Sequence, residues 1–178
     1  MLHRHQTVSE IGEVGSPART PFTVLLCGIA ACILVFASGV RDVSMASGRS
    51  PLAAYLTGFM AVSAAGVGVF SLPHPLHDIF GMSELIGYQA PLVLALTWRR
   101  DVRARTLVVF PWSMFALLWI ALGLNMSAMD RHGPVWAHVK PAYGLAQRAL
   151  FAAWFGWCTG VGLLLYRRTG HTASVEMH

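Results

Sequence analysis

One face of a single apolar segment carries polar side chains that could do chemistry. His77, Gly81, Glu84 and Tyr88 are spaced four, three and four residues apart, so a helix would place them in one row. The other faces of this segment carry mostly isoleucine, leucine, valine, phenylalanine and alanine. Polar side chains in a membrane helix face the interior of the protein or a water-filled cavity. The row therefore indicates either a functional site or groups that only hydrogen-bond to neighbouring helices.

Glu84 and Arg148 are charged residues that fall inside predicted membrane segments. Each lies about six or seven residues after the start of its segment, which is a depth of roughly 10 Å. A single charge at that depth is unfavourable, so a partner is expected. We expect the two side chains to pair, or to hold the polar headgroup of a ligand together. The alternative is that Arg148 extends toward lipid phosphates at the membrane surface.

A second candidate site combines histidine with carboxylate. His74, His77 and Asp78 lie within about one helical turn and could bind zinc or another divalent ion, although the spacing lacks a full zinc signature such as H-E-x-x-H. Glu10 could add a ligand or a general base, with metal-activated water as the nucleophile. Histidines are also common in loops at a membrane surface. We therefore predict neither a metal nor another cofactor, and keep metal-dependent hydrolysis as an alternative.

The composition indicates which environment must position these residues. Only 12% of the 178 residues are charged, 55% are apolar, and the mean hydropathy is +0.55. A soluble domain has about 25% charged residues, so this chain has the composition of a membrane protein whose main partner is the lipid bilayer. No nucleic-acid partner is expected despite the net charge of +5. The basic residues lie in gaps between apolar runs, whereas a nucleic-acid-binding face would gather them in one stripe.

Five apolar segments are long enough to cross a bilayer, which takes about 20 helical residues. They cover residues 22–40, 52–72, 77–98, 107–125 and 143–166 of a single membrane domain, residues 1–178. A polar segment, residues 1–21, precedes them, and a cytoplasmic tail, residues 167–178, follows. The fold class is therefore an all-α polytopic transmembrane bundle of five spans. The third segment is interrupted by Glu84, Gln89 and Pro91, so a re-entrant segment is the alternative there.

The basic residues between the segments predict the orientation of the chain. The loops 41–51 and 99–106 and the tail contain eight arginines. The N-terminal segment, the two other loops and the start of the fifth segment contain four arginines and one lysine. The positive-inside rule makes the side with eight arginines cytoplasmic. We therefore predict a plasma membrane protein of the bacterial inner-membrane type, with the N-terminus outside and the C-terminus inside.

Small residues indicate where helices should pack closely. Ala152, Gly156 and Gly160 form a ladder in the fifth segment, and Ala64 with Gly68 forms a shorter one in the second. We expect both ladders to join helices of the same bundle, and they leave the oligomeric state open.

Three short motifs resemble a known family. The stretch Thr7-Val-Ser-Glu-Ile-Gly12, followed by Ser16-Pro17, is similar to an outer-loop motif of the form Ser-Glu-x-Gly. That motif belongs to a bacterial and archaeal membrane family called domain of unknown function 998. In this family a polar loop with proline precedes a helix opened by histidine, as Pro73, His74 and His77 do here. The last helix opens with Gly-Leu-x-Gln-Arg, and residues 144–148 read Gly-Leu-Ala-Gln-Arg.

The resemblance covers roughly residues 7–168 and implies a particular architecture. Family members have six helices, so this chain would begin in the loop after the first and lack that helix. No activity follows, because the family is named for lacking one. The resemblance also implies that several polar residues share the outer side of the membrane: Ser9, Glu10, His77, Gln147 and Arg148.

Together these observations predict a polar pocket open to the outer face. Its candidate residues are Ser9, Glu10, His74, His77, Asp78, Glu84, Gln147 and Arg148. The first functional hypothesis is a non-enzymatic membrane protein that binds a small polar or lipid-like ligand there. The alternatives are a membrane-embedded metal-dependent hydrolase and a structural or accessory subunit whose polar groups only hold helices together.

Overall fold

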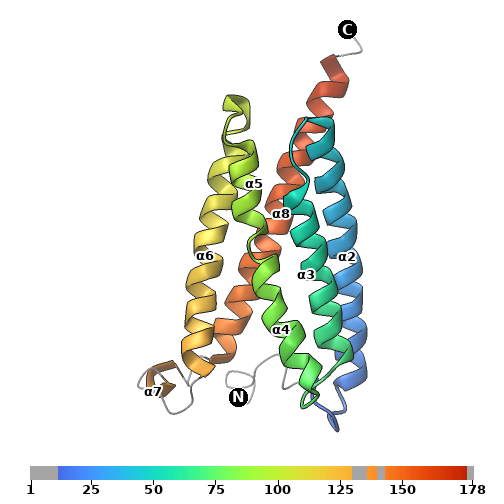
Figure 1. Cartoon of the computed structure of the whole chain (residues 1–178), viewed down its shortest axis with the longest axis vertical. Helices are drawn as coiled ribbons and strands as arrows, with labels where there is room; N and C mark the ends of the chain where they lie inside the picture. The colour runs from blue at the N-terminus through green and yellow to red at the C-terminus, as the bar shows by residue number, and fades with distance from the viewer. Residues whose placement is uncertain (1–11, 130–135, 140–142, 176–178) are drawn as a thin grey trace.

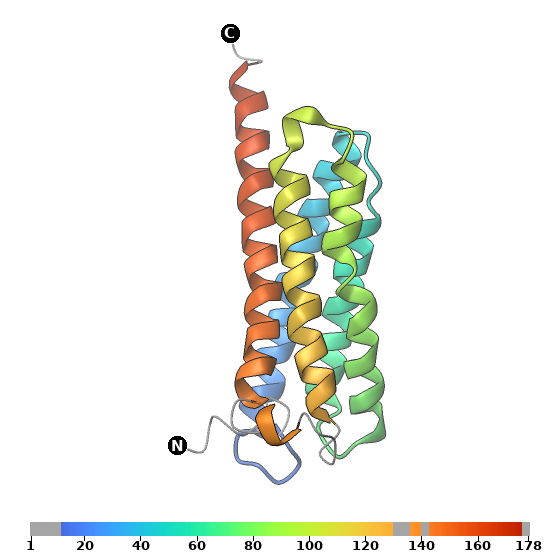
Figure 2. The same ribbon diagram turned by 90° about the vertical axis from the view of Figure 1, so that its left-hand side faces the viewer.

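The computed structural model describes residues 12–129, 136–139 and 143–175, and this part of the chain contains helices and turns but no strand (Figure 1). Five helical spans are long and apolar enough to cross a membrane: Arg19–Ala46, Leu52–Val69, Pro75–Trp98, Thr106–Ser127 and Gly144–Arg168. Figures 1 and 2 show them side by side in one bundle. The predicted all-α bundle of five spans is confirmed, and the chain is a multi-pass membrane protein.

The two ends of the bundle differ in their charged residues. We call the upper end in Figure 1 the basic end, because the described arginines there are Arg41, Arg49, Arg99, Arg100, Arg105, Arg167 and Arg168. We call the opposite end the histidine end, because it carries His74, His77 and His138.

The first two spans form a tightly packed hairpin. Helix α2 (Arg19–Ala46) ends at a turn in which Gly48 has a φ of 64°, a conformation that favours glycine, and α3 (Leu52–Val69) returns alongside it. A Cβ atom on Gly68 would lie 2.8 Å from Leu26 of α2. The Thr23 hydroxyl donates a hydrogen bond of 2.8 Å to the Gly68 carbonyl. The expected close packing at Gly68 is therefore present, and it joins α3 to α2.

The third span is broken into two helices inside the membrane. Helix α4 (Pro75–Gly87) begins two residues before the predicted span, and α5 (Ala90–Trp98) follows it after Tyr88 and Gln89. The break comes just before Pro91, which has no N–H to donate to the carbonyl four residues earlier. The Gln89 side-chain amide donates a 3.0 Å hydrogen bond to the Leu85 carbonyl, which keeps one backbone acceptor of the break satisfied.

The two halves nevertheless continue in one direction. In Figure 1, α4 and α5 together run from the histidine end to the basic end. This course contradicts the alternative of a re-entrant segment. At the break α4 approaches α3 closely, since a Cβ atom on Gly87 would lie 2.6 Å from the Met60 side chain.

The last two spans complete the bundle. A short 3-10 turn (η2, Val102–Ala104) leads into α6 (Thr106–Met129), a short helix α7 (Trp136–Val139) follows, and α8 runs from Tyr143 to Val175. Most of the predicted tail, residues 167–178, is therefore a continuation of the fifth helix. Gly160 of α8 faces the Phe110 ring of α6 so closely that a Cβ atom would clash with it. By contrast, Ala152 and Gly156 of the predicted ladder are exposed.

A row of aromatic rings connects three spans through the centre of the bundle. Phe36 of α2 lies edge-on to Trp157 of α8, with 5.7 Å between ring centroids, and Trp157 lies 5.0 Å from Trp154. Trp154 in turn contacts the ring of Tyr88 at 5.6 Å. Trp154, Trp157 and Tyr88 are at most 2% exposed. Neither tryptophan's indole nitrogen has a hydrogen-bond partner, so the two rings stabilise the bundle through packing.

A cluster of charges around a buried tryptophan joins three segments at the basic end. The guanidinium groups of Arg49 and Arg168 lie 5.8 and 4.9 Å from the Trp98 ring centroid, which is cation–π distance. The Asp101 carboxylate accepts a 2.6 Å hydrogen bond from Arg168 and lies 3.8 Å from Arg49. This cluster therefore holds the α2–α3 loop, the end of α5 and α8 together.

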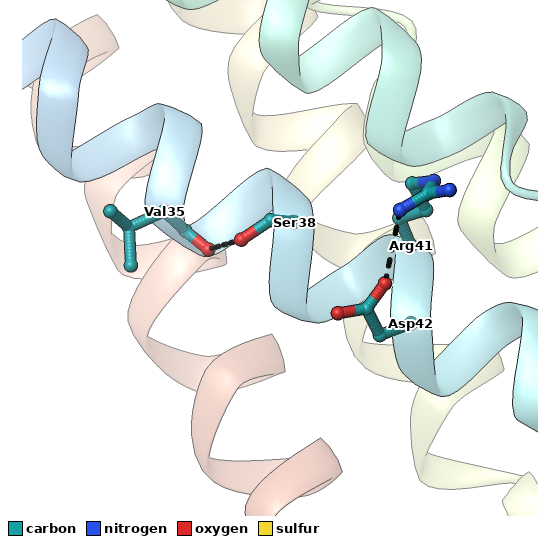
Figure 3. A network of polar contacts seen from close by, with 4 residues as sticks. All are labelled: Val35, Ser38, Arg41 and Asp42. Carbon is teal, nitrogen blue, oxygen red and sulfur yellow. Dashed lines mark hydrogen bonds and ion pairs between the residues drawn. The ribbon is translucent and has the colours of Figure 1, made fainter.

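We predict that Asp101→Asn lowers the free energy of unfolding by about 1.5–3 kcal/mol, because two guanidinium groups lose their charged partner in a mostly buried place. The matched control is Asp42→Asn. Asp42 forms a 3.3 Å ion pair with Arg41 that is exposed on α2 (Figure 3), so its loss should cost less than about 1 kcal/mol. Both free energies of unfolding can be measured in mixed micelles that contain an increasing fraction of denaturing detergent. Equal effects of the two substitutions would contradict the structural role of Asp101.

Candidate functional site

Glu84 is the acidic residue that the structure places deepest in the third span. It lies on α4, one turn before the break, on the same side as the buried residues His77 and Tyr88. Its Oε2 atom accepts a 3.2 Å hydrogen bond from the Tyr88 hydroxyl. No arginine, lysine or histidine of the described residues forms an ion pair with it. The carboxylate therefore has one polar partner, and that partner lies on its own segment.

Tyr88 fixes this carboxylate in relation to the rest of the bundle. The tyrosine is 2% exposed, and its ring lies at 76° to Trp154 of α8. Tyr88 follows the end of α4 directly, and its ring centroid lies 5.6 Å from that of Trp154. The hydroxyl that binds Glu84 is thus held in position by an aromatic contact between two spans.

His77 has a structural partner in α3. Its Nδ1 atom lies 3.2 Å from the Val67 carbonyl and 3.0 Å from the Phe70 carbonyl, and the side chain is 6% exposed. Because both partners can only accept, Nδ1 carries the proton. His77 therefore supplies a donor to carbonyls at the end of α3, where a helix leaves its last carbonyls without intrahelical partners.

His74 and Asp78 serve the start of α4. The Nδ1 atom of His74 accepts a 3.2 Å hydrogen bond from the Leu76 N–H, so His74 is the N-cap of the helix. Asp78 is exposed in the first turn, where a negative charge is favourable to the helix dipole. No group of three or more histidine, cysteine, aspartate or glutamate side chains among the described residues could hold a metal ion. The described part of the predicted metal cluster, His74, His77 and Asp78, therefore does not converge.

Arg148 does not pair with Glu84. Its Nη1 atom donates a 2.9 Å hydrogen bond to the Gly144 carbonyl, back toward the histidine end of α8. Arg148 lies six residues before Trp154, which turns it about 120° away from the side of α8 that contacts Tyr88. The direct Glu84–Arg148 pair that we expected is therefore wrong for this structure. The physical reason is the register of α8, which points the two side chains in different directions.

The structure says less about the remaining candidate residues of the predicted pocket. Gln147 is half-buried near the start of α8. Ser9 and Glu10 lie outside the described residues. The side chains of His74, His77, Asp78, Glu84 and Arg148 form no hydrogen bond or ion pair with one another.

Two polar contacts between segments were not expected from the sequence. The hydroxyls of Ser63 on α3 and Ser83 on α4 lie 2.7 Å apart and share a hydrogen bond between the helices. At the basic end, Asp101 is the single acidic residue among the arginines of residues 99–105, which is the signal that could have indicated the Arg49–Asp101–Arg168 cluster. Serines are frequent in apolar helices, so the Ser63–Ser83 contact had no comparable signal.

Comparison with known proteins adds no further assignment. No protein family model matches the sequence, and neither a curated protein nor a solved structure is significantly similar to it.

We predict that His77→Leu lowers the free energy of unfolding by about 1–3 kcal/mol, because carbonyls at the end of α3 lose a buried donor. Asp78→Asn, one residue away but exposed, should change it by less than about 0.5 kcal/mol. Unfolding in denaturing detergent measures the effect of each substitution, and repeating it with added zinc measures the effect of the metal. We expect zinc to leave the wild-type midpoint unchanged. A zinc-dependent increase that disappears in His77→Leu would contradict this role of His77.

Proposed function

We propose that this membrane protein binds a small ligand carrying a positively charged group, with Glu84 as the residue that contacts it. The proposal rests on the hydrogen bond that Glu84 forms with Tyr88. Among the described residues the carboxylate bonds only to Tyr88, four residues later in the same span, so within this part of the chain it does not bond directly to a neighbouring span.

The other polar groups of the span have evident structural uses. His77 bonds to carbonyls of α3, Ser83 bonds to Ser63 of α3, and Gln89 satisfies a carbonyl at the break. A carboxylate inside the membrane is costly and usually marks a functional site. Glu84 accepts a hydrogen bond from the buried Tyr88 hydroxyl, which a neutral amide could also do, so ligand binding is proposed to account for its charge.

The chemistry of the site favours a cation. A carboxylate with no basic partner among the described residues offers negative charge and hydrogen-bond acceptors, which suit an ammonium group. Interrupted membrane helices are also common where transport proteins bind their substrates. A ligand held jointly by Glu84 and Arg148 has less support, because Arg148 lies toward another side of α8.

One alternative retains specific support. The contacts of His77 and Ser83 with α3 are what an accessory or structural protein would need from its polar groups. Metal-dependent hydrolysis has no such observation among the described residues. Membership of the family called domain of unknown function 998 is likewise part of the proposal, and it rests on the three short motifs alone.

The test of ligand binding uses tetramethylammonium as the probe. At about ten times its dissociation constant it should raise the free energy of unfolding of the wild-type protein by about 1.4 kcal/mol over an equal concentration of sodium chloride. Glu84→Gln keeps an oxygen that can accept from Tyr88 but removes the charge, so it should fold normally and lose this stabilisation.

Asp42→Asn is the matched control, because it removes an exposed carboxylate at the basic end and should keep the full effect. If Glu84→Gln unfolds far more easily than the wild type and the probe stabilises neither protein, Glu84 is structural and the accessory role is correct.

We propose further that the basic end faces the cytoplasm, so that the histidine end faces outside. The support is the excess of arginine at the basic end. A C-terminal green fluorescent protein should fluoresce in bacterial cells, and a C-terminal alkaline phosphatase should be inactive. An active phosphatase fusion would reverse the orientation.

A further inference from the structure

An apolar groove opens between α2 and α8 near the basic end. Its cavity volume is about 200 Å³, and its lining comes from residues between Phe36 and Val43 of α2 and from Gly162, Leu165 and Tyr166 of α8. Both stretches lie in the last turns of spans that are apolar enough to cross a membrane. The groove therefore lies in the half of the bilayer next to the basic end.

Two glycines create the hollow. A Cβ atom added to Gly39 would meet nothing within 4 Å, and one added to Gly162 would meet only the Phe36 ring, at 3.8 Å. The two helices still contact each other through the rings of Phe36 and Trp157, and Phe36 also lines the groove. The hollow therefore lies where two glycines present no side chain, beside an aromatic contact between the two helices.

The charged residues next to the lining in the sequence are Arg41 and Asp42 of α2, which form an exposed ion pair, and Arg167 of α8. Arg167 follows the lining residue Tyr166 directly and is exposed. Arg168, the next residue of α8, and Arg49 both contact the Asp101 carboxylate at the same end of the bundle. Exposed arginines at the membrane surface attract anionic headgroups.

We propose that this groove binds a phospholipid with an anionic headgroup, with one acyl chain in the hollow and the phosphate at Arg167. An acyl chain is the apolar group that the surrounding bilayer supplies at this depth, and the headgroup would lie at the level where α8 changes from apolar residues to arginine. A second copy of the chain fits less well, because a stable interface buries more than about 1,000 Å² and seven lining residues offer only a fraction of that. The proposal is independent of the ligand at Glu84.

The experiment measures retained lipids by native mass spectrometry. The purified protein is incubated in detergent with equal amounts of phosphatidylglycerol and phosphatidylcholine. The wild-type protein should retain phosphatidylglycerol in preference to phosphatidylcholine. Gly39→Leu should retain it at least about tenfold less, because a leucine side chain displaces more than two methylene groups of the acyl chain.

Two matched controls separate the groove from general effects. Gly28→Leu adds the same side chain to the same helix, at another exposed glycine with nothing within 4 Å, and should retain lipid like the wild type. Arg167→Gln should reduce the preference for phosphatidylglycerol, whereas Arg105→Gln, another exposed arginine at the same end, should leave it unchanged.

Three results would overturn the proposal. The first is equal retention of both lipids by the wild type. The second is an equal loss in Gly39→Leu and Gly28→Leu. The third is a wild-type dimer that Gly39→Leu converts to a monomer without any change in bound lipid, which would assign the groove to a second copy.

Discussion

The missing N–H of Pro91 in the middle of a membrane-spanning segment determines much of this structure. Backbone groups inside a bilayer must find partners within the protein, and at Pro91 the third span loses the N–H that a regular helix would supply. It divides into α4 and α5, and Gln89 supplies a side-chain donor at the break. Tyr88, in the same break, packs against Trp154 and so joins the third span to α8. The aromatic row then continues through Trp157 to Phe36 of α2.

The two ends of the bundle are held by different interactions, and this difference separates structure from function. At the basic end, Arg49 and Arg168 enclose Trp98 and share Asp101, which joins segments far apart in the sequence. At the histidine end, His77 and His74 complete the hydrogen bonding of helix termini. His74 and His77, which look like metal ligands in the sequence, therefore form hydrogen bonds with backbone groups instead. Glu84 lies between these two regions, and its hydrogen bond from Tyr88 stays within the third span.

The sequence was sufficient to predict the five spans, but it predicted the contacts of the candidate site less well. Long uncharged runs between arginine-bearing loops predicted five spans, because the bilayer thickness fixes how many apolar residues a helix needs. The spacing of His77, Glu84 and Tyr88 correctly predicted a shared face, since helical periodicity is a local property. The Glu84–Arg148 pair failed because depth along two helices says nothing about the rotation of each helix about its axis. That rotation depends on how side chains such as Trp154 pack, which no single segment of sequence specifies.

Infrared difference spectroscopy of the protein in lipid membranes tests the central claim, that Glu84 binds a cationic group, most directly. Exchanging sodium chloride for tetramethylammonium chloride should change the carboxyl and carboxylate bands of the wild-type protein. If the claim is right, this change disappears in Glu84→Gln and persists in Asp42→Asn. A spectrum of Glu84→Gln identical to that of the wild type would contradict it.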